Sequence, residues 1–292
     1  MNLPVIVSIV IRTSIVLTVL SVGLSATPAQ ALSVLRSPIR LAQSIGTMML
    51  VVPLFTAILA SALELQPDAQ FALVALSVSP VPPFWPAKSK RGGGDESYTV
   101  GVLVASALLS VVTIPIVLGA FGVFFSVNIA VPLTTIARVT SATVLLPLLI
   151  GMTIRALAWG LAYRAARPVG YAGTALLALS VLLILARAWP SMAALFGDGT
   201  MLTLGAFTTI GLIAGHVFGG PADEERTTLA LACSTRHPAI ALSIALANYP
   251  SSPRVAPTIL LYVLVSGAVS AAYLQWVRRR SRPRHHRLSV LR

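Results

Sequence analysis

The sequence predicts an all-α polytopic membrane protein with about nine transmembrane spans. Its 292 residues are 56% hydrophobic and only 10% charged, whereas soluble domains average about 25% charged residues. The mean hydropathy is +0.88, and long apolar stretches recur from one end of the chain to the other. Too few charged side chains remain to cover a soluble surface, so an ordinary soluble enzyme is excluded. We expect one membrane domain over residues 1–292.

Hydropathy, proline and glycine positions, and charges delimit nine apolar segments. They cover approximately residues 4–25, 41–62, 68–97, 98–124, 137–157, 169–190, 199–219, 226–248 and 257–278. The third segment is interrupted by four prolines between positions 80 and 86, and proline breaks helices because it lacks an N–H and clashes with the preceding turn. The eighth is interrupted at residues 233–238, Cys-Ser-Thr-Arg-His-Pro. The other segments are expected to be continuous helices.

Basic residues predict the orientation. The net charge is +13, and seven arginines lie in residues 278–292. If that tail is cytoplasmic, the outer loops hold little more than Arg254, and the inner loops hold Arg36, Arg40, Lys88, Lys90, Arg91, Arg164, Arg167 and Arg226. This asymmetry follows the positive-inside rule. We expect a multi-pass protein of the inner or plasma membrane, with its N-terminus outside and a cytoplasmic tail that contacts lipid, not nucleic acid.

The start of the chain admits a second interpretation. Residues 29–31, Ala-Gln-Ala, resemble a signal-peptide cleavage site. The preceding segment begins without Lys or Arg, and Arg12 interrupts its apolar run. A retained first span is therefore favoured over a cleaved signal peptide.

The two interrupted segments occupy corresponding places in the two halves of the chain. Unwound backbone is tolerated at membrane depth only where it is buried in protein or lines a cavity. Paired discontinuous helices therefore indicate the binding site of a secondary transporter. The alternative is a pair of proline-kinked helices without a role in transport.

A series of short motifs in a fixed order carries a resemblance. The motifs are Gly23-Leu24, Arg36-Ser37-Pro38, Pro53-Leu54, Ser79-Pro80, Gly94-Asp95, the Pro147 to Gly151 stretch, and the small, apolar run from Pro238 to Ala247. In this order and spacing the chain resembles the bile acid:sodium symporter family. The resemblance implies two inverted repeats of five helices, with two discontinuous helices that cross at the membrane midplane.

The resemblance also implies a division into a core and a panel. The first family helix is missing here, so the first repeat would cover residues 1–124, the second 125–278, and a basic cytoplasmic tail 279–292. The core would hold spans two to four and seven to nine. The panel would hold spans one, five and six.

The sodium-binding positions of the family are largely lost. Carried over one by one, they fall on Met48, Trp85, Pro86, Thr99, Leu103, Cys233 and His237. Sodium is a hard cation that, like calcium, prefers oxygen ligands, and only Thr99 offers a side-chain oxygen. We therefore expect no sodium pair, no resident cofactor and no metal site. Proton coupling through His237 remains open, because an imidazole titrates near neutral pH; His237 could equally be a packed histidine.

Fixed positive charge replaces the lost ligands. Arg236 lies within the second break, and Lys88 and Lys90 lie near the first, where they could also be charges of an inner loop. An ionisable residue at membrane depth is costly and is a functional candidate by default. One interpretation is that the tethered guanidinium of Arg236 supplies the charge of the absent sodium ions. The predicted substrate-binding residues are Ser79, Pro80, Thr99, Ser234, Thr235, Arg236 and His237.

The favoured function is a secondary transporter that moves a small organic anion by alternating access. Cationic groups and helix N-termini at the breaks favour a negative ligand. The alternatives are an efflux carrier of the arsenite or auxin type, a proton-coupled antiporter and a non-transporting membrane sensor. A membrane enzyme is disfavoured, because no nucleophile–base or metal-ligand spacing is found. The oligomeric state is not predicted.

Overall fold

The computed structural model describes residues 3–63 and 65–281, and the regular elements among them are all helical. The predicted all-α class is therefore confirmed. The elements are α1 (Leu3–Ser25), α2 (Pro28–Ala31), α3 (Pro38–Leu41), the π-helical η1 (Ala42–Val51), α4 (Val52–Ala62), α5 (Pro67–Val78), α6 (Trp85–Arg91), α7 (Glu96–Phe125), α8 (Leu133–Thr140), the π-helical η2 (Ser141–Leu145), α9 (Leu146–Leu157), α10 (Trp159–Ala193), α11 (Thr200–Phe218), α12 (Asp223–Ser234), α13 (Pro238–Asn248) and α14 (Val255–Ser281).

Within the described residues, seven helical runs are long and apolar enough to cross a membrane. Two further segments of the expected nine, at the start of the chain and at α5, are shorter apolar helices. The first break shortens α5, because the backbone after Val78 enters a proline-rich stretch. The membrane class is therefore confirmed, while the count of nine spans is not.

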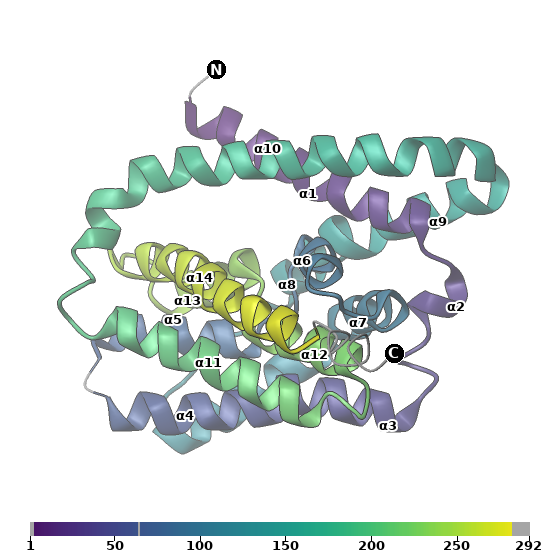
Figure 1. Ribbon diagram of the computed structural model, residues 1–292. Coiled ribbons are helices and arrows are strands. Elements are labelled where there is room, and N and C mark those ends of the chain that lie inside the picture. Colours follow the sequence, from purple (N-terminus) through teal and green to yellow (C-terminus); the bar gives the residue numbers. More distant parts are fainter. Residues whose placement is uncertain (1–2, 64, 282–292) are drawn as a thin grey trace, which may run out of the picture.

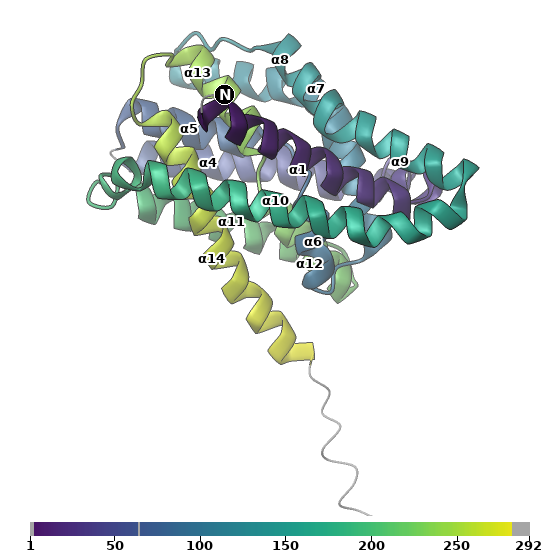
Figure 2. The ribbon, with the colours of Figure 1, turned by 90° about the horizontal axis from the view of Figure 1, so that it is seen from above.

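The helices form two layers. α1 packs along α10 and against α9, and these three helices make a separate layer that we name the panel (Figure 1). The helices α3 to α7 and α11 to α14 form the second layer, which we name the core; α8 contacts α7 and α13 of the core, and η2 contacts both α1 and α7. Figure 2 shows α1 and α10 lying side by side over the core. The two repeats that the family resemblance implies, residues 1–124 and 125–278, stay a prediction.

Small residues let the panel helices approach closely. The Ser21 hydroxyl on α1 donates to the Ala166 carbonyl oxygen on α10 at 2.7 Å. A Cβ added at Gly170 or Gly173 of α10 would overlap the side chain of Ser21 or Thr18. Small residues at membrane helix interfaces allow this backbone approach and the dispersion contacts that accompany it.

Several basic residues lie on helices where the sequence analysis expected loops. Arg164 and Arg167 belong to the first turns of α10, which begins at Trp159, ten residues earlier than expected. Lys88, Lys90 and Arg91 lie on the short helix α6. The first residues of the expected tail, 279–281, continue α14, and the remainder lies outside the described residues.

Replacing Gly215 of α11 by alanine should lower the thermal stability of the purified protein. The added Cβ would overlap the backbone of Leu229 and Ala230 on α12, and such overpacking costs about 1–3 kcal/mol. Gly205→Ala on the same helix is the matched control, because no atom lies within 4 Å of its added Cβ. Equal melting temperatures for the two variants would contradict the α11–α12 packing.

Candidate functional site

The breaks in the two discontinuous helices lie against each other inside the core. The backbone N–H of His237 donates to the carbonyl oxygen of Pro80 at 2.8 Å. Around this contact α5 packs against α13, and α6 packs against α12. The second break ends at Pro238, the first residue of α13, because the residue before a proline is biased away from helical geometry. Two unwound segments, far apart in sequence, therefore meet in the middle of the core.

Arg236 joins the two breaks through its side chain. It is fully buried, and its guanidinium donates to the carbonyl oxygens of Cys233 at 3.1 Å, Ser79 at 3.1 Å and Met48 at 2.9 Å. Cys233 and Ser79 lie at the C-terminal ends of α12 and α5, where unpaired carbonyls carry partial negative charge. No carboxylate pairs with Arg236 among the described residues. Helix ends and a free carbonyl thus take the place of an acidic partner.

The carbonyl of Met48 is free because of a proline five residues later. In η1 the backbone N–H of Val52 bonds to the Thr47 carbonyl oxygen, the five-residue spacing of a π-helix. At the same spacing the partner of Met48 would be Pro53, which has no N–H. The carbonyl oxygen of Met48 therefore has no backbone donor, and it accepts the hydrogen bond from the guanidinium of Arg236.

Further hydrogen bonds fix the second break. The Tyr262 hydroxyl on α14 accepts from the backbone N–H of Arg236 at 2.7 Å and donates to the Ser234 carbonyl oxygen at 2.9 Å. The ammonium of Lys88 donates to the hydroxyls of Thr235 at 2.7 Å and Ser270 at 2.9 Å. A second cation is therefore held at the break by hydroxyl groups.

Six of the seven predicted site residues gather at the breaks, and Thr99 does not. The hydroxyls of Ser79 and Ser234 donate to carbonyl oxygens of their own helices, at Ala75 and Leu231. Thr99 lies on α7, where its hydroxyl is 2.8 Å from the Ser89 hydroxyl. The structure thus divides the predicted residues between the breaks and a neighbouring hydroxyl pair.

His237 has an unusual environment at the second break. Its side chain is 1% exposed, and neither ring nitrogen has a hydrogen-bond partner among the described residues. The indole N–H of Trp85, in the first turn of α6, is buried without a partner as well. Unpaired buried polar groups are costly. Packing alone therefore does not explain why a histidine stands at position 237 and a tryptophan at position 85.

A cavity of about 580 Å³ lies between the panel and the core. Its walls come from α1, α2 and α10 on one side and from α6 and α7 on the other. Three basic residues line it, Lys90, Arg91 and Arg167, with one acidic residue, Glu96. Thr99 also lines it, whereas the six predicted residues at the breaks do not.

Sequence reasoning missed several of these residues. It assigned Arg167 only to a loop, although Arg167 lines the cavity. It placed Lys88 near the first break or in an inner loop, whereas Lys88 bonds to the second break. It did not find Tyr262 or Ser270, because isolated hydroxyls in apolar helices carry no signal in sequence. The free carbonyl of Met48 could not be found from sequence, because in a regular α-helix Pro53 would free the carbonyl of Met49, and only the π-helical spacing of η1 moves the vacancy to Met48.

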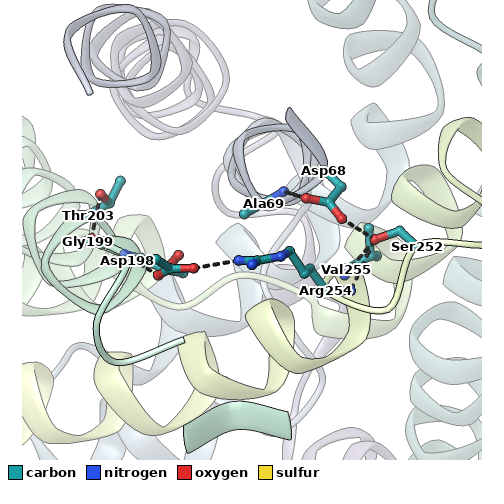
Figure 3. Close-up of polar contacts among 9 residues, drawn as sticks. Asp68, Ala69, Asp198, Gly199, Thr203, Ser252, Arg254 and Val255 are labelled. Carbon is teal, nitrogen blue, oxygen red and sulfur yellow. Dashed lines mark hydrogen bonds and ion pairs between the residues drawn. The ribbon is translucent and has the colours of Figure 1, made fainter. Parts of the chain in front are cut away.

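A second polar cluster joins the first turn of α5 to the loops that precede α11 and α14 (Figure 3). The Ser252 hydroxyl donates to Asp68 at 2.5 Å, and Arg254 pairs with Asp198 at 2.6 Å. Asp198 also accepts the backbone N–H of Thr200 at 3.1 Å. Asp198 lies on the connection from α10 to α11, so this ion pair fixes the link between panel and core.

Two broken helices in contact within an apolar core, and a cavity between two helical layers, define an integral membrane protein of the transporter class. The chain belongs to the sodium bile acid symporter family, whose sequence model matches residues 13–194. It is therefore a transporter of the bile acid:sodium symporter kind. The match includes the first break and ends before the second, which holds Arg236. A comparison with curated proteins gave no match.

Replacing Asp198 by asparagine should destabilise the protein in a pH-dependent way. Partial burial disfavours the charged carboxylate, but hydrogen bonds from Thr200 and Arg254 outweigh it and hold the pKa of Asp198 below its usual value. The ion pair therefore stabilises the fold above the unfolded pKa, about 3.9, and this contribution disappears as pH falls through the folded pKa.

Thermal unfolding of parent and variant at a series of pH values checks this prediction. At neutral pH the loss should be at most about 1 kcal/mol, because the pair is partly exposed. Arg254→Gln should show the same pH dependence. A difference that stays constant down to about pH 3 would contradict the assigned ionisation of Asp198.

Proposed function

We propose that the protein is a secondary transporter that moves a small organic anion across the cell membrane by alternating access. The observation that carries the proposal is the basic cavity between panel and core. Its volume of about 580 Å³ lies within the range of small-molecule sites, about 300–1,000 Å³.

The charges of the cavity favour an anion. Lys90 and Arg91 come from α6 in the core, and Arg167 comes from α10 in the panel. Glu96 approaches Lys90 only at 3.5 Å, and both side chains are largely exposed, so this pair neutralises little charge. A carboxylate or sulfonate could bridge the two layers, since guanidinium groups bind such oxyanions through paired hydrogen bonds.

The two layers suit alternating access because each is tightly joined within itself. Small-residue contacts join α1 and α10 in the panel, and Arg236 joins three segments of the core. The proposal includes nine spans in inverted repeats, in which α1 to α7 correspond to α10 to α14. The run of α8 and α9 is the first helix of the second repeat, and its counterpart in the first repeat is missing. It places the N-terminus outside and the basic end of α14 in the cytoplasm of an inner or plasma membrane.

Transport in this proposal does not use sodium. Arg236 already supplies a positive charge to the carbonyl oxygens of the crossing helices, and Cys233 stands where the family resemblance implies a carboxylate. The carbonyl contacts of Arg236 support this role, because the carbonyl oxygens of Ser79, Cys233 and Met48 each already accept a hydrogen bond from its guanidinium.

Proton coupling through His237 is the second candidate. Its buried ring nitrogens have no partner among the described residues, so the ring has a lone pair available to take up a proton when the site opens to water. Without that step, the protein would work by facilitated diffusion.

Substitutions in the cavity should weaken anion uptake into proteoliposomes. Arg167→Gln and Lys90→Gln should each raise KM for the transported anion about tenfold, the effect of losing one charge-assisted hydrogen bond. A panel of radiolabelled carboxylates and sulfonates serves as substrates. Arg164→Gln is the matched control, because Arg164 lies on the same helix and does not line the cavity. Unchanged KM in both cavity variants would refute the site.

Uptake at fixed pH and voltage should not depend on sodium. Arg236→Ala should abolish uptake, and added guanidinium should restore part of it, because the three freed carbonyl oxygens can accept its N–H groups. A steep rise of uptake with sodium in the parent protein would overturn the assigned role of Arg236, and size-exclusion profiles show whether each variant is folded.

His237→Gln should flatten any pH dependence of uptake if the histidine carries the proton.

A further inference from the structure

A groove of about 360 Å³ follows the outer surface between α11 and α14. Leu212, Ile213, Val217 and Val269 give it apolar walls, and Ile213 is 58% exposed. Both helices are candidate membrane spans. A surface of this kind at the level of the hydrocarbon core would contact acyl chains.

Aromatic side chains close one end of the groove. Nδ1 of His216 lies 2.8 Å from the Tyr273 hydroxyl, and the rings of His216 and Trp276 meet edge to face with centroids 5.5 Å apart. Tyrosine and tryptophan are enriched at the membrane–water interface, where one side of the ring is apolar and the other is wet. This end of the groove therefore has the chemistry of the headgroup level.

Arginines continue beyond the aromatic residues. Arg278, Arg279 and Arg280 form the last turn of α14 that is described, and the guanidinium of Arg280 lies 4.4 Å from the centre of the Trp276 ring. No carboxylate pairs with Arg279 or Arg280 within residues 3–63 and 65–281. Figure 2 shows this end of α14 projecting beyond the other helices. Its cationic groups are thus open to a ligand.

We infer that this groove binds an anionic phospholipid. One acyl chain lies along the apolar walls, and the phosphate is held by Arg279 and Arg280 beside the aromatic end. Complementary charge selects this occupant, because basic clusters at the cytoplasmic end of membrane helices attract anionic headgroups. The inference does not depend on the transported substrate.

Quenching of Trp276 fluorescence by brominated lipids tests the site. Trp159 and Trp189 are replaced by phenylalanine, and Trp85 is kept because it is fully buried and gives a constant background. The protein is reconstituted in phosphatidylcholine vesicles that contain a small fraction of brominated phosphatidylglycerol or brominated phosphatidylcholine. We expect phosphatidylglycerol to quench at a markedly lower mole fraction than phosphatidylcholine.

Variants of the two arginines and a protein with a different tryptophan reporter serve as controls. Arg279→Gln and Arg280→Gln should each reduce the preference for phosphatidylglycerol about fivefold. A protein that keeps Trp189 in place of Trp276 should be quenched equally by both lipids, because Trp189 lies near the C-terminal end of α10, and the arginine turn is at the end of α14 that projects away from α10 (Figure 2). Equal quenching of Trp276 by both lipids, or no quenching because a second copy covers the groove, would overturn the inference.

Discussion

The buried guanidinium of Arg236 is the interaction on which the core depends. It holds carbonyl oxygens from η1, from the end of α5 and from the end of α12, and each of these segments lacks an internal donor at that point. A charge without a carboxylate is costly in an apolar interior. Here the ends of two helices compensate it, since the partial negative charges of their carbonyls converge on one cation. The same contacts relieve the unpaired backbone that the two breaks create.

This arrangement explains why the molecule divides into two layers. The core has a polar centre, in which the hydrogen bonds of Arg236 join α5, α12 and η1. The panel has no such centre and is held by close contacts of Ser21 with Ala166 and of Gly173 with Thr18. The cavity that carries the basic residues lies between the two layers. The alternating access that we propose would use this division, since it requires two stable parts that move relative to each other.

Six of the seven predicted site residues lie together at the breaks, and Thr99 lies apart from them. Arg236 and His237 stand out in sequence because charged and titratable groups are rare in apolar segments. Thr99 was grouped with them by resemblance, but it lies on α7 beside Ser89. Lys88 was expected near the first break or in an inner loop, yet α6 turns its ammonium toward Thr235 at the second break and toward Ser270. Where a long side chain ends depends on which helix packs opposite, and hydropathy does not encode that.

The sequence by itself determined the membrane class, the approximate segments and the positions of both breaks. These properties follow from local causes: apolar runs partition into lipid, and prolines interrupt helices wherever they stand. The structure alone decided that the breaks meet, that Arg236 bonds to Met48 and Ser79, and that Arg167 from one layer shares a cavity with Lys90 from the other. Those contacts join residues up to 188 positions apart. They depend on how helices pack against one another, which no local pattern of residues specifies.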